Sequence, residues 1–70
     1  MSMTEKIKIL LLKRKKAVKE LAEDLKCTSQ NLSGKFRRDN FSINELQEIA
    51  QALDCSLEIN FVMNDTKDKI

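Results

Sequence analysis

Residues 18–33, VKELAEDLKCTSQNLS, decide the fold of this chain. Four apolar residues in the first half recur at helical spacing, namely Val18, Leu21, Ala22 and Leu25. A short break follows, and Thr28 is a residue type that caps the start of a helix. Small polar residues then open a second helix, which we expect to run to about Arg38 with Leu32 and Phe36 as its buried residues. The stretch therefore predicts two short helices that meet at a tight turn.

The flanking segments predict two more helices around this pair. The first, from about Thr4 to Arg14, carries its apolar face on Met3, Ile7, Leu10 and Leu11. The last carries the apolar stripe Leu46, Ile49, Ala50 and Leu53. Capping boxes are predicted at both starts, by the pairs Ser2–Glu5 and Ser42–Glu45. Ile9 and Leu12 point away from the apolar face of the first helix and are expected on the surface.

The period changes near the end of the chain, where alternation over residues 57–63 is typical of a strand. A lone strand leaves its backbone hydrogen-bonding groups unpaired, so we expect it to pair with the same strand of a second copy about a two-fold axis. The expected dimer interface is Leu57, Ile59, Phe61, Val62 and Met63. The alternative is an extended tail packed on its own domain. We predict a mainly α fold with a four-helix domain over residues 1–55, a dimerisation strand over 56–63 and a flexible tail over 64–70.

Composition excludes several classes of function. The 70 residues include no histidine and two cysteines, Cys27 and Cys55, which form neither a zinc set nor a redox pair. We expect both thiols to be reduced, as in the cytoplasm. The longest apolar run, Ile9–Leu12, is too short to span a bilayer, and no leader peptide is recognisable. Without a phosphate-binding loop or paired carboxylates either, we expect no enzyme activity, no cofactor and no metal.

Charge is distributed unevenly along the chain. Residues 1–20 carry seven lysines and arginines against two glutamates, whereas residues 42–70 carry two lysines against six acidic residues. Such asymmetry indicates one surface that faces a polyanion and another that faces away. The alternative is a solvated, lysine-rich helix end.

The sequence resembles the phage-repressor/Cro-like (XRE-type) helix-turn-helix family over roughly residues 4–55. ELAEDL at residues 20–25, followed by SQNLS at residues 29–33, is similar to the motif of that family. Its scaffold positions correspond to Ala22, Leu25 and Leu32. The resemblance implies a DNA-binding protein of prokaryotic, phage or mobile-element origin.

The chain departs from the family pattern at two positions. The family usually has glycine in the turn, because the backbone there is left-handed, and this chain has Lys26. The family also favours Ser or Thr as the cap of the first motif helix, where this chain has Ala17. The resemblance therefore implies a positive φ at Lys26, which costs a non-glycine residue roughly 1 kcal/mol.

The second helix of the motif presents polar side chains to a DNA groove. We expect base contacts from Ser29, Gln30, Asn31, Ser33 and Gly34. Gln30 is the best base reader, because its amide bonds bidentately to adenine N6 and N7. Phosphate contacts are expected from Lys16, Lys19, Lys35, Arg37, Arg38 and Asn40. The alternatives are an ordinary solvated helix and, for Gly34, a tolerated weak spot near the end of a short helix.

The sequence thus predicts a cytoplasmic, sequence-specific regulator, a repressor or autoregulator, that binds double-stranded operator DNA as a homodimer. No small-molecule effector and no membrane are expected as partners. One alternative is a protein-interaction module, such as an antitoxin or adaptor, that uses the C-terminal strand together with Ile9 and Leu12. A second is a membrane-surface peptide built on the basic segment from Lys6 to Lys19, which is weaker because three further helices need the apolar face of that segment.

Overall fold

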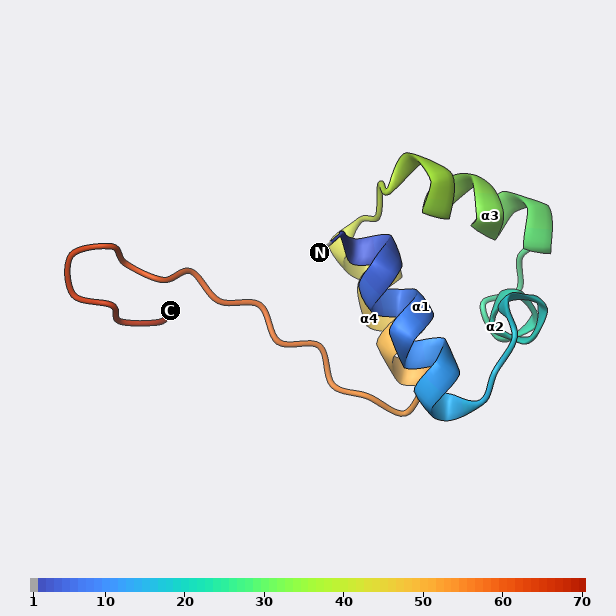
Figure 1. Cartoon of the computed structure of the whole chain (residues 1–70), viewed down its shortest axis with the longest axis horizontal. Coiled ribbons are helices and arrows are strands. Elements are labelled where there is room, and N and C mark those ends of the chain that lie inside the picture. Colours follow the sequence, from blue (N-terminus) through green and yellow to red (C-terminus); the bar gives the residue numbers. More distant parts are fainter. Residues whose placement is uncertain (1) are drawn as a thin grey trace.

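Four helices form a small bundle from which the C-terminal residues project (Figure 1). The structure is a computed structural model that describes residues 2–70. The helices are α1 (Met3–Arg14), α2 (Val18–Asp24), α3 (Ser29–Arg38) and α4 (Ile43–Ala52). The mainly helical fold and the order of the helices are confirmed, and the predicted boundaries agree with the observed ones to within about a residue.

Hydroxyl side chains fix where three of the helices begin. The predicted caps each accept a backbone N–H three residues ahead: Ser2 from Glu5 at 3.1 Å, Thr28 from Asn31 at 3.0 Å and Ser42 from Glu45 at 3.1 Å. Glu45 also accepts the Ser42 N–H at 2.9 Å, which completes that capping box. Glu5 instead accepts the Ser2 hydroxyl at 3.3 Å, so only half of the predicted box forms there. Each such cap contributes about 1 kcal/mol to helix stability.

The turn between α2 and α3 uses a left-handed residue. Lys26 has a φ of 58°, as the family resemblance implies. The Cys27 N–H donates to the Ala22 carbonyl at 2.9 Å, which closes the turn over the end of α2. Leu21 and Leu32, on either side of the turn, are almost completely buried. Packing across the turn therefore offsets the backbone cost at Lys26.

The apolar stripes predicted from helical spacing meet in one core. Its buried members are Ile7, Leu11, Leu21, Ala22, Leu32, Phe36, Ile49 and Leu53. Burial of each large aliphatic side chain stabilises the fold by about 1.5–3 kcal/mol. Ile9 and Leu12 lie outside this core at 40% and 79% exposure, as expected.

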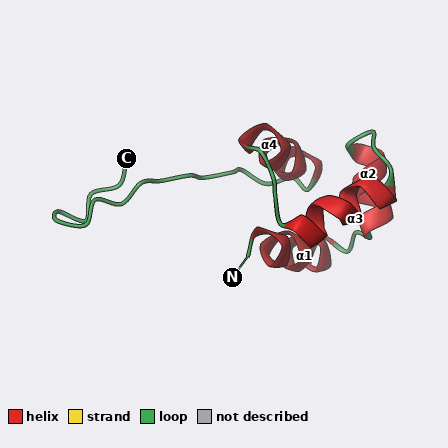
Figure 2. Cartoon of the chain, turned by 90° about the horizontal axis from the view of Figure 1, so that it is seen from above, coloured by secondary structure: helices red, strands yellow, loops and turns green. Residues whose placement is uncertain are grey.

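The C-terminal residues differ from the prediction. Residues 56–70, which we call the arm, leave the bundle and extend away from it (Figures 1 and 2). Within residues 2–70 the helices are accompanied by no continuous strand, only by one isolated antiparallel bridge between Val62 and Lys69. Phe61 and Ile70 exchange backbone hydrogen bonds at 2.9 and 2.8 Å. The arm therefore folds back on itself, so that its last residues lie beside residues 61–63.

The five residues expected at a dimer interface have different surroundings. Leu57 is half-buried and lines a hollow on its own bundle together with Ile7 and Leu10. The other four are exposed: Ile59, Phe61, Val62 and Met63. The sequence alternation thus corresponds to an extended segment whose first apolar residue lies against its own domain.

Candidate nucleic-acid interface

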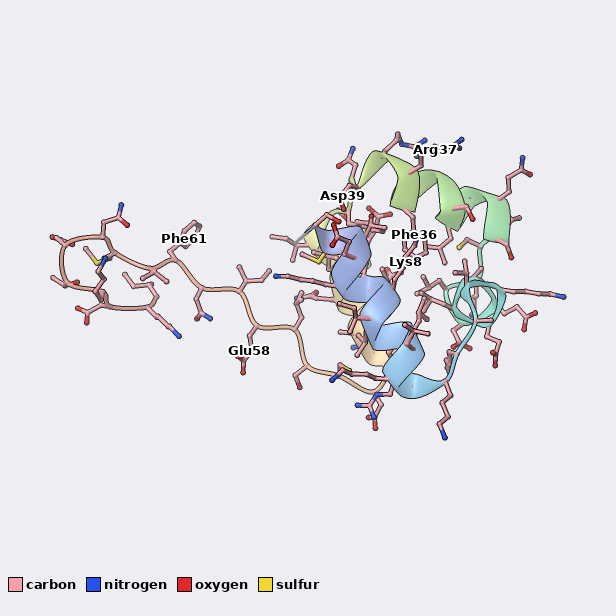
Figure 3. The ribbon with its side chains drawn as sticks, in the orientation of Figure 1. Lys8, Phe36, Arg37, Asp39, Glu58 and Phe61 are labelled. Atoms are coloured by element: carbon pink, nitrogen blue, oxygen red, sulfur yellow. The ribbon has the colours of Figure 1, made fainter. Side chains whose placement is uncertain are left out.

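α3 has one buried face and one face open to solvent. Leu32 and Phe36 are buried on the inner face, and the ring of Phe36 lies 5.9 Å from that of Phe41, measured between centroids. Figure 3 shows Phe36 directed into the bundle and Arg37 on the opposite side of the helix. The outer face is therefore open to solvent through its side chains, while the backbone at Gly34 is buried beneath them.

This outer face brings together most of the residues expected to contact DNA. A shallow hollow runs along it, lined by Thr28, Gln30, Asn31, Gly34, Arg37 and Arg38. Ser29 and Ser33 are exposed but do not line the hollow. α3 contains no acidic residue, so this surface suits a polyanion. The cations of the last turn also interact favourably with the negative end of the helix dipole.

Gly34 lines the hollow but is buried beneath its neighbours. A Cβ placed on it would lie 3.5 Å from Nη1 of Arg38 and 4.0 Å from Nη2 of Arg37. Long side chains on helices point back toward the N-terminus, so the two arginines cover the turn before their own. The sequence predicted the correct side of the helix for Gly34 but not this cover.

A polar clasp holds the C-terminal end of α3 against the start of α1. Asp39, which ends α3 with a left-handed φ of 52°, accepts the Thr4 N–H at 2.8 Å and lies 2.9 Å from the Thr4 hydroxyl. That hydroxyl also lies 2.8 Å from the Phe36 carbonyl, so its one proton is shared between this carbonyl and the Asp39 carboxylate. The clasp satisfies an amide of α1 and a carbonyl of α3 together. It joins residues 35 positions apart, and nothing in the sequence pattern pointed to it.

This geometry consists of two helices, a left-handed turn and a polar outer face on the second helix. The family model of the Cro/C1-type HTH DNA-binding domain matches residues 6–58 of the chain. The chain belongs to this family. No curated protein and no solved structure matches it. The predicted Cro-like helix-turn-helix is thereby confirmed, with α2 and α3 as its two helices.

We expected Lys16 and Lys35 of this Cro/C1-type domain to contact DNA phosphates. Both have partners within the chain instead. The Lys16 ammonium lies 2.6 Å from Oδ2 of Asp24 and 3.3 Å from the Ala52 carbonyl, so it ties the ends of α2 and α4 together. The Lys35 ammonium is paired with Glu45, which ties α3 to α4. Both lysines are half-buried and have a structural role that their positions in the sequence did not indicate.

Glu45 is the carboxylate most strongly perturbed by its surroundings in the described part of this Cro/C1-type domain. The hydrogen bond from Lys35, followed by that from the Ser42 N–H, lowers the pKa of Glu45 from 4.5 to about 2. Glu45 therefore stays ionised at every physiological pH. It joins the cap of α4 to the recognition helix α3 through one side chain.

The remaining expected phosphate contacts, Lys19 and Asn40, are exposed. At the start of α2, Ala17 offers no side-chain acceptor, and Glu20 accepts the Ala17 N–H at 3.0 Å. In residues 2–70 of the domain, no cluster of histidine, cysteine or acidic residues has the size needed to hold a metal ion. No helix in that range has the length and apolar character needed to cross a membrane.

Proposed function

We propose that this Cro/C1-type domain is a sequence-specific regulator of transcription that places α3 in the major groove of double-stranded DNA. The observation that carries the proposal is the outer face of α3, which combines amide, hydroxyl and guanidinium groups with a complete lack of carboxylates. Repression or autoregulation is the mode of action that we infer, because a domain bound at its operator excludes other proteins from that site.

Base contacts are assigned to the N-terminal half of α3. Gln30 lines the hollow and offers an amide that can pair bidentately with adenine N6 and N7. Ser29, Asn31 and Ser33 are exposed around it and offer weaker, less selective hydrogen bonds. Gly34 has no side chain and is covered by Arg37 and Arg38, so we assign it no base contact of its own.

Phosphate contacts are assigned to exposed groups near the two motif helices: Lys19, Arg37 and Asn40. Such contacts position the domain on the duplex without reading its sequence. Lys16 and Lys35 are left out of this set, because their ammonium groups already have carboxylate partners.

The test is selection of binding sites from random duplex DNA, followed by affinity measurements on the best site. Gln30→Ala is expected to lose about 1–3 kcal/mol on that site and to relax the preference at one base pair. Lys19→Ala, the matched control, is expected to weaken all sequences alike. Failure to select any sequence would overturn the proposal, and equal, uniform losses from both changes would overturn the assignment of Gln30.

We further propose that the domain acts as a homodimer joined through the arm. Phe61 is 78% and Ile70 76% exposed, and the two are paired through their backbones. A two-stranded hairpin is at best marginally stable alone in water, so cover from a second copy would stabilise this one. Dimers of helix-turn-helix proteins also match two half-sites one helical turn apart.

Mass measurement in solution tests the dimer. Phe61→Glu introduces a charge at a side chain exposed in the monomer and is expected to give folded monomers with weak affinity for a single half-site. Asn60→Glu, the control on the neighbouring position of the arm, is expected to remain dimeric, since successive side chains of an extended chain face opposite sides. A wild-type chain that is monomeric at tens of micromolar, roughly the range where a regulator dimer should persist, would contradict the proposal.

A protein-interaction module, such as an antitoxin or adaptor, is the second candidate. The observation that favours it is the exposure of large apolar side chains on two separate segments, Leu12 of α1 at 79% and Phe61 of the arm at 78%. A wild-type chain that is monomeric and selects no DNA sequence would favour this candidate over the first.

A further inference from the structure

Three residues form a row along the outer face of α3. Gln30, Gly34 and Arg38 are four residues apart, and at about 100° per residue such positions stack on one side of a helix. Leu32 and Phe36 are buried on the opposite side, so the row faces outward with Gly34 at its middle. Arg38 belongs by sequence to the helix end, but its guanidinium does not lie there. Nη1 and Nη2 of Arg38 lie 3.5 and 3.8 Å from the point where a Gly34 Cβ would be.

We propose that Arg38 is a specificity-determining residue that reads a guanine. This guanine would lie about one turn of α3 beyond the base that Gln30 contacts. This inference rests on the proposed DNA-binding function and replaces the phosphate contact that the sequence predicted for Arg38. The planar guanidinium offers paired donors that match guanine O6 and N7, the commonest specific contact in the major groove.

The lack of a competing partner supports this role. Among residues 2–70, the ion pairs involve Lys16 and Lys35, and neither Arg37 nor Arg38 forms one. Asp39, the nearest carboxylate in sequence, is occupied by Thr4. The guanidinium of Arg38 is therefore available to a base without first breaking a salt bridge.

The small residue at position 34 leaves room for the Arg38 guanidinium. Any large side chain at the middle of the row would occupy the space where the Arg38 guanidinium lies. A glycine inside a helix is otherwise unfavourable compared with alanine. Position 34 therefore needs a small residue if an arginine from the next turn is to lie over it, and an alanine would still meet Arg38 only at an ordinary contact distance.

Arg37 is the matched control. It is the same residue type at the adjacent position, and only one of its nitrogens comes as near as 4.0 Å to the Gly34 Cβ position. Seven residues from Gln30 and three from Gly34, it lies toward one edge of the outer face. We expect Arg37 to contact phosphate, as the sequence predicted.

The experiment is a binding profile over all single-base variants of the selected site, for the wild type, Arg38→Ala, Arg38→Lys and Arg37→Ala. Arg38→Ala is expected to lose about 5- to 150-fold of discrimination at one G·C pair, with preferences at other positions retained. Arg38→Lys keeps the charge but not the paired donors, so it is expected to lose most of the same discrimination. Arg37→Ala is expected to weaken all sites by a common factor. Thermal melts should show that all the variants remain folded at the temperature of the binding measurements.

A uniform loss in Arg38→Ala that lysine restores would show a phosphate contact and overturn the proposal. An unchanged profile in Arg38→Ala would overturn it as well. These outcomes differ from failure of the DNA-binding function itself, in which the wild type would select no site. Gly34→Ala is an independent test. Its Cβ would make only an ordinary contact with Arg38, so the G·C preference is expected to survive. Loss of that preference would contradict the placement of Arg38.

Discussion

Removal of the carboxylate of Asp39 should weaken the domain in a graded and diagnostic way. Asp39 accepts the Thr4 N–H at 2.8 Å and faces the Thr4 hydroxyl at 2.9 Å. Hydrogen bonds to charged groups contribute about 1.5–3 kcal/mol when well shielded. Because Asp39 is exposed, we take the lower end for the pair together and expect Asp39→Ala to lose about 2 kcal/mol of unfolding free energy. In a domain of this size that lowers the melting temperature by about 10 °C.

Two further substitutions distinguish the stability that comes from the hydrogen bonds to Thr4 from the strain of the left-handed backbone at Asp39. Asp39 has a φ of 52°, so Asp39→Gly removes the acceptor but relieves about 1 kcal/mol of left-handed strain, for a net loss of about 1 kcal/mol. Asp39→Asn retains an oxygen acceptor and tolerates the same backbone, and should lose the least of the three. The expected order of stability is wild type, Asn, Gly, Ala.

Chemical denaturation of these variants, combined in a cycle with Thr4→Val, gives the coupling directly. We expect Thr4→Val and Asp39→Ala to be non-additive by about 1 kcal/mol, because both remove the same hydrogen bond. Additive effects, or an Asp39→Ala variant within about 0.5 kcal/mol of the wild type, would refute the reasoning.

Three more predictions concern other features of the bundle. Lys26→Gly should be neutral or stabilising by up to about 1 kcal/mol, since glycine removes the side-chain cost of a φ of 58° while its greater unfolded-state entropy offsets part of the gain; a clearly lower melting temperature would contradict it. Glu45 has a folded pKa lowered from 4.5 to about 2, chiefly by Lys35, so its contribution is complete above about pH 4.5 and is lost as pH falls toward 2. Thermal melts over that range should therefore be less steep with pH in Glu45→Gln, and identical slopes would count against the Lys35–Glu45 pair. Gly34→Ala should raise the unfolding free energy by roughly 1 kcal/mol in chemical denaturation, because its Cβ would make only an ordinary contact with Arg38; an unchanged or lower stability would contradict this.

The helices could be predicted because their signals are local. The cap at Thr28, the box at Ser42 and Glu45, and the stripe through Leu21 lie within a few residues of what they specify. The clasp between Thr4 and Asp39 could not be predicted in this way, because its partners are 35 positions apart and each is a common surface residue type.

The arm shows a second limit of local patterns. Alternation over residues 57–63 predicted a strand, but among residues 2–70 only an isolated bridge between Val62 and Lys69 forms there. The returning segment has no such alternation, and its turn uses a left-handed Lys67 where a glycine would have been a clearer signal. Pairing of Met63 with Asp68 was therefore not foreseen.

The candidate site was predicted in outline. Helical geometry gave the outer face of α3, but not the direction of long side chains along it. The sequence predicted a phosphate contact for Arg38 and gave no sign that its guanidinium lies over Gly34. Lys35 was expected to contact phosphate because its carboxylate partner, Glu45, belongs to another helix and is not evident from local sequence.

The measurement that tests the central claim most directly is the affinity of the wild-type chain for its selected duplex relative to a scrambled duplex, over a series of salt concentrations. The account predicts tighter binding to the selected site by a factor on the order of a thousand or more. It also predicts that both affinities fall steeply as salt rises, since phosphate contacts release counterions. Equal affinities for the two duplexes, or an affinity indifferent to salt, would contradict recognition of DNA by the outer face of α3.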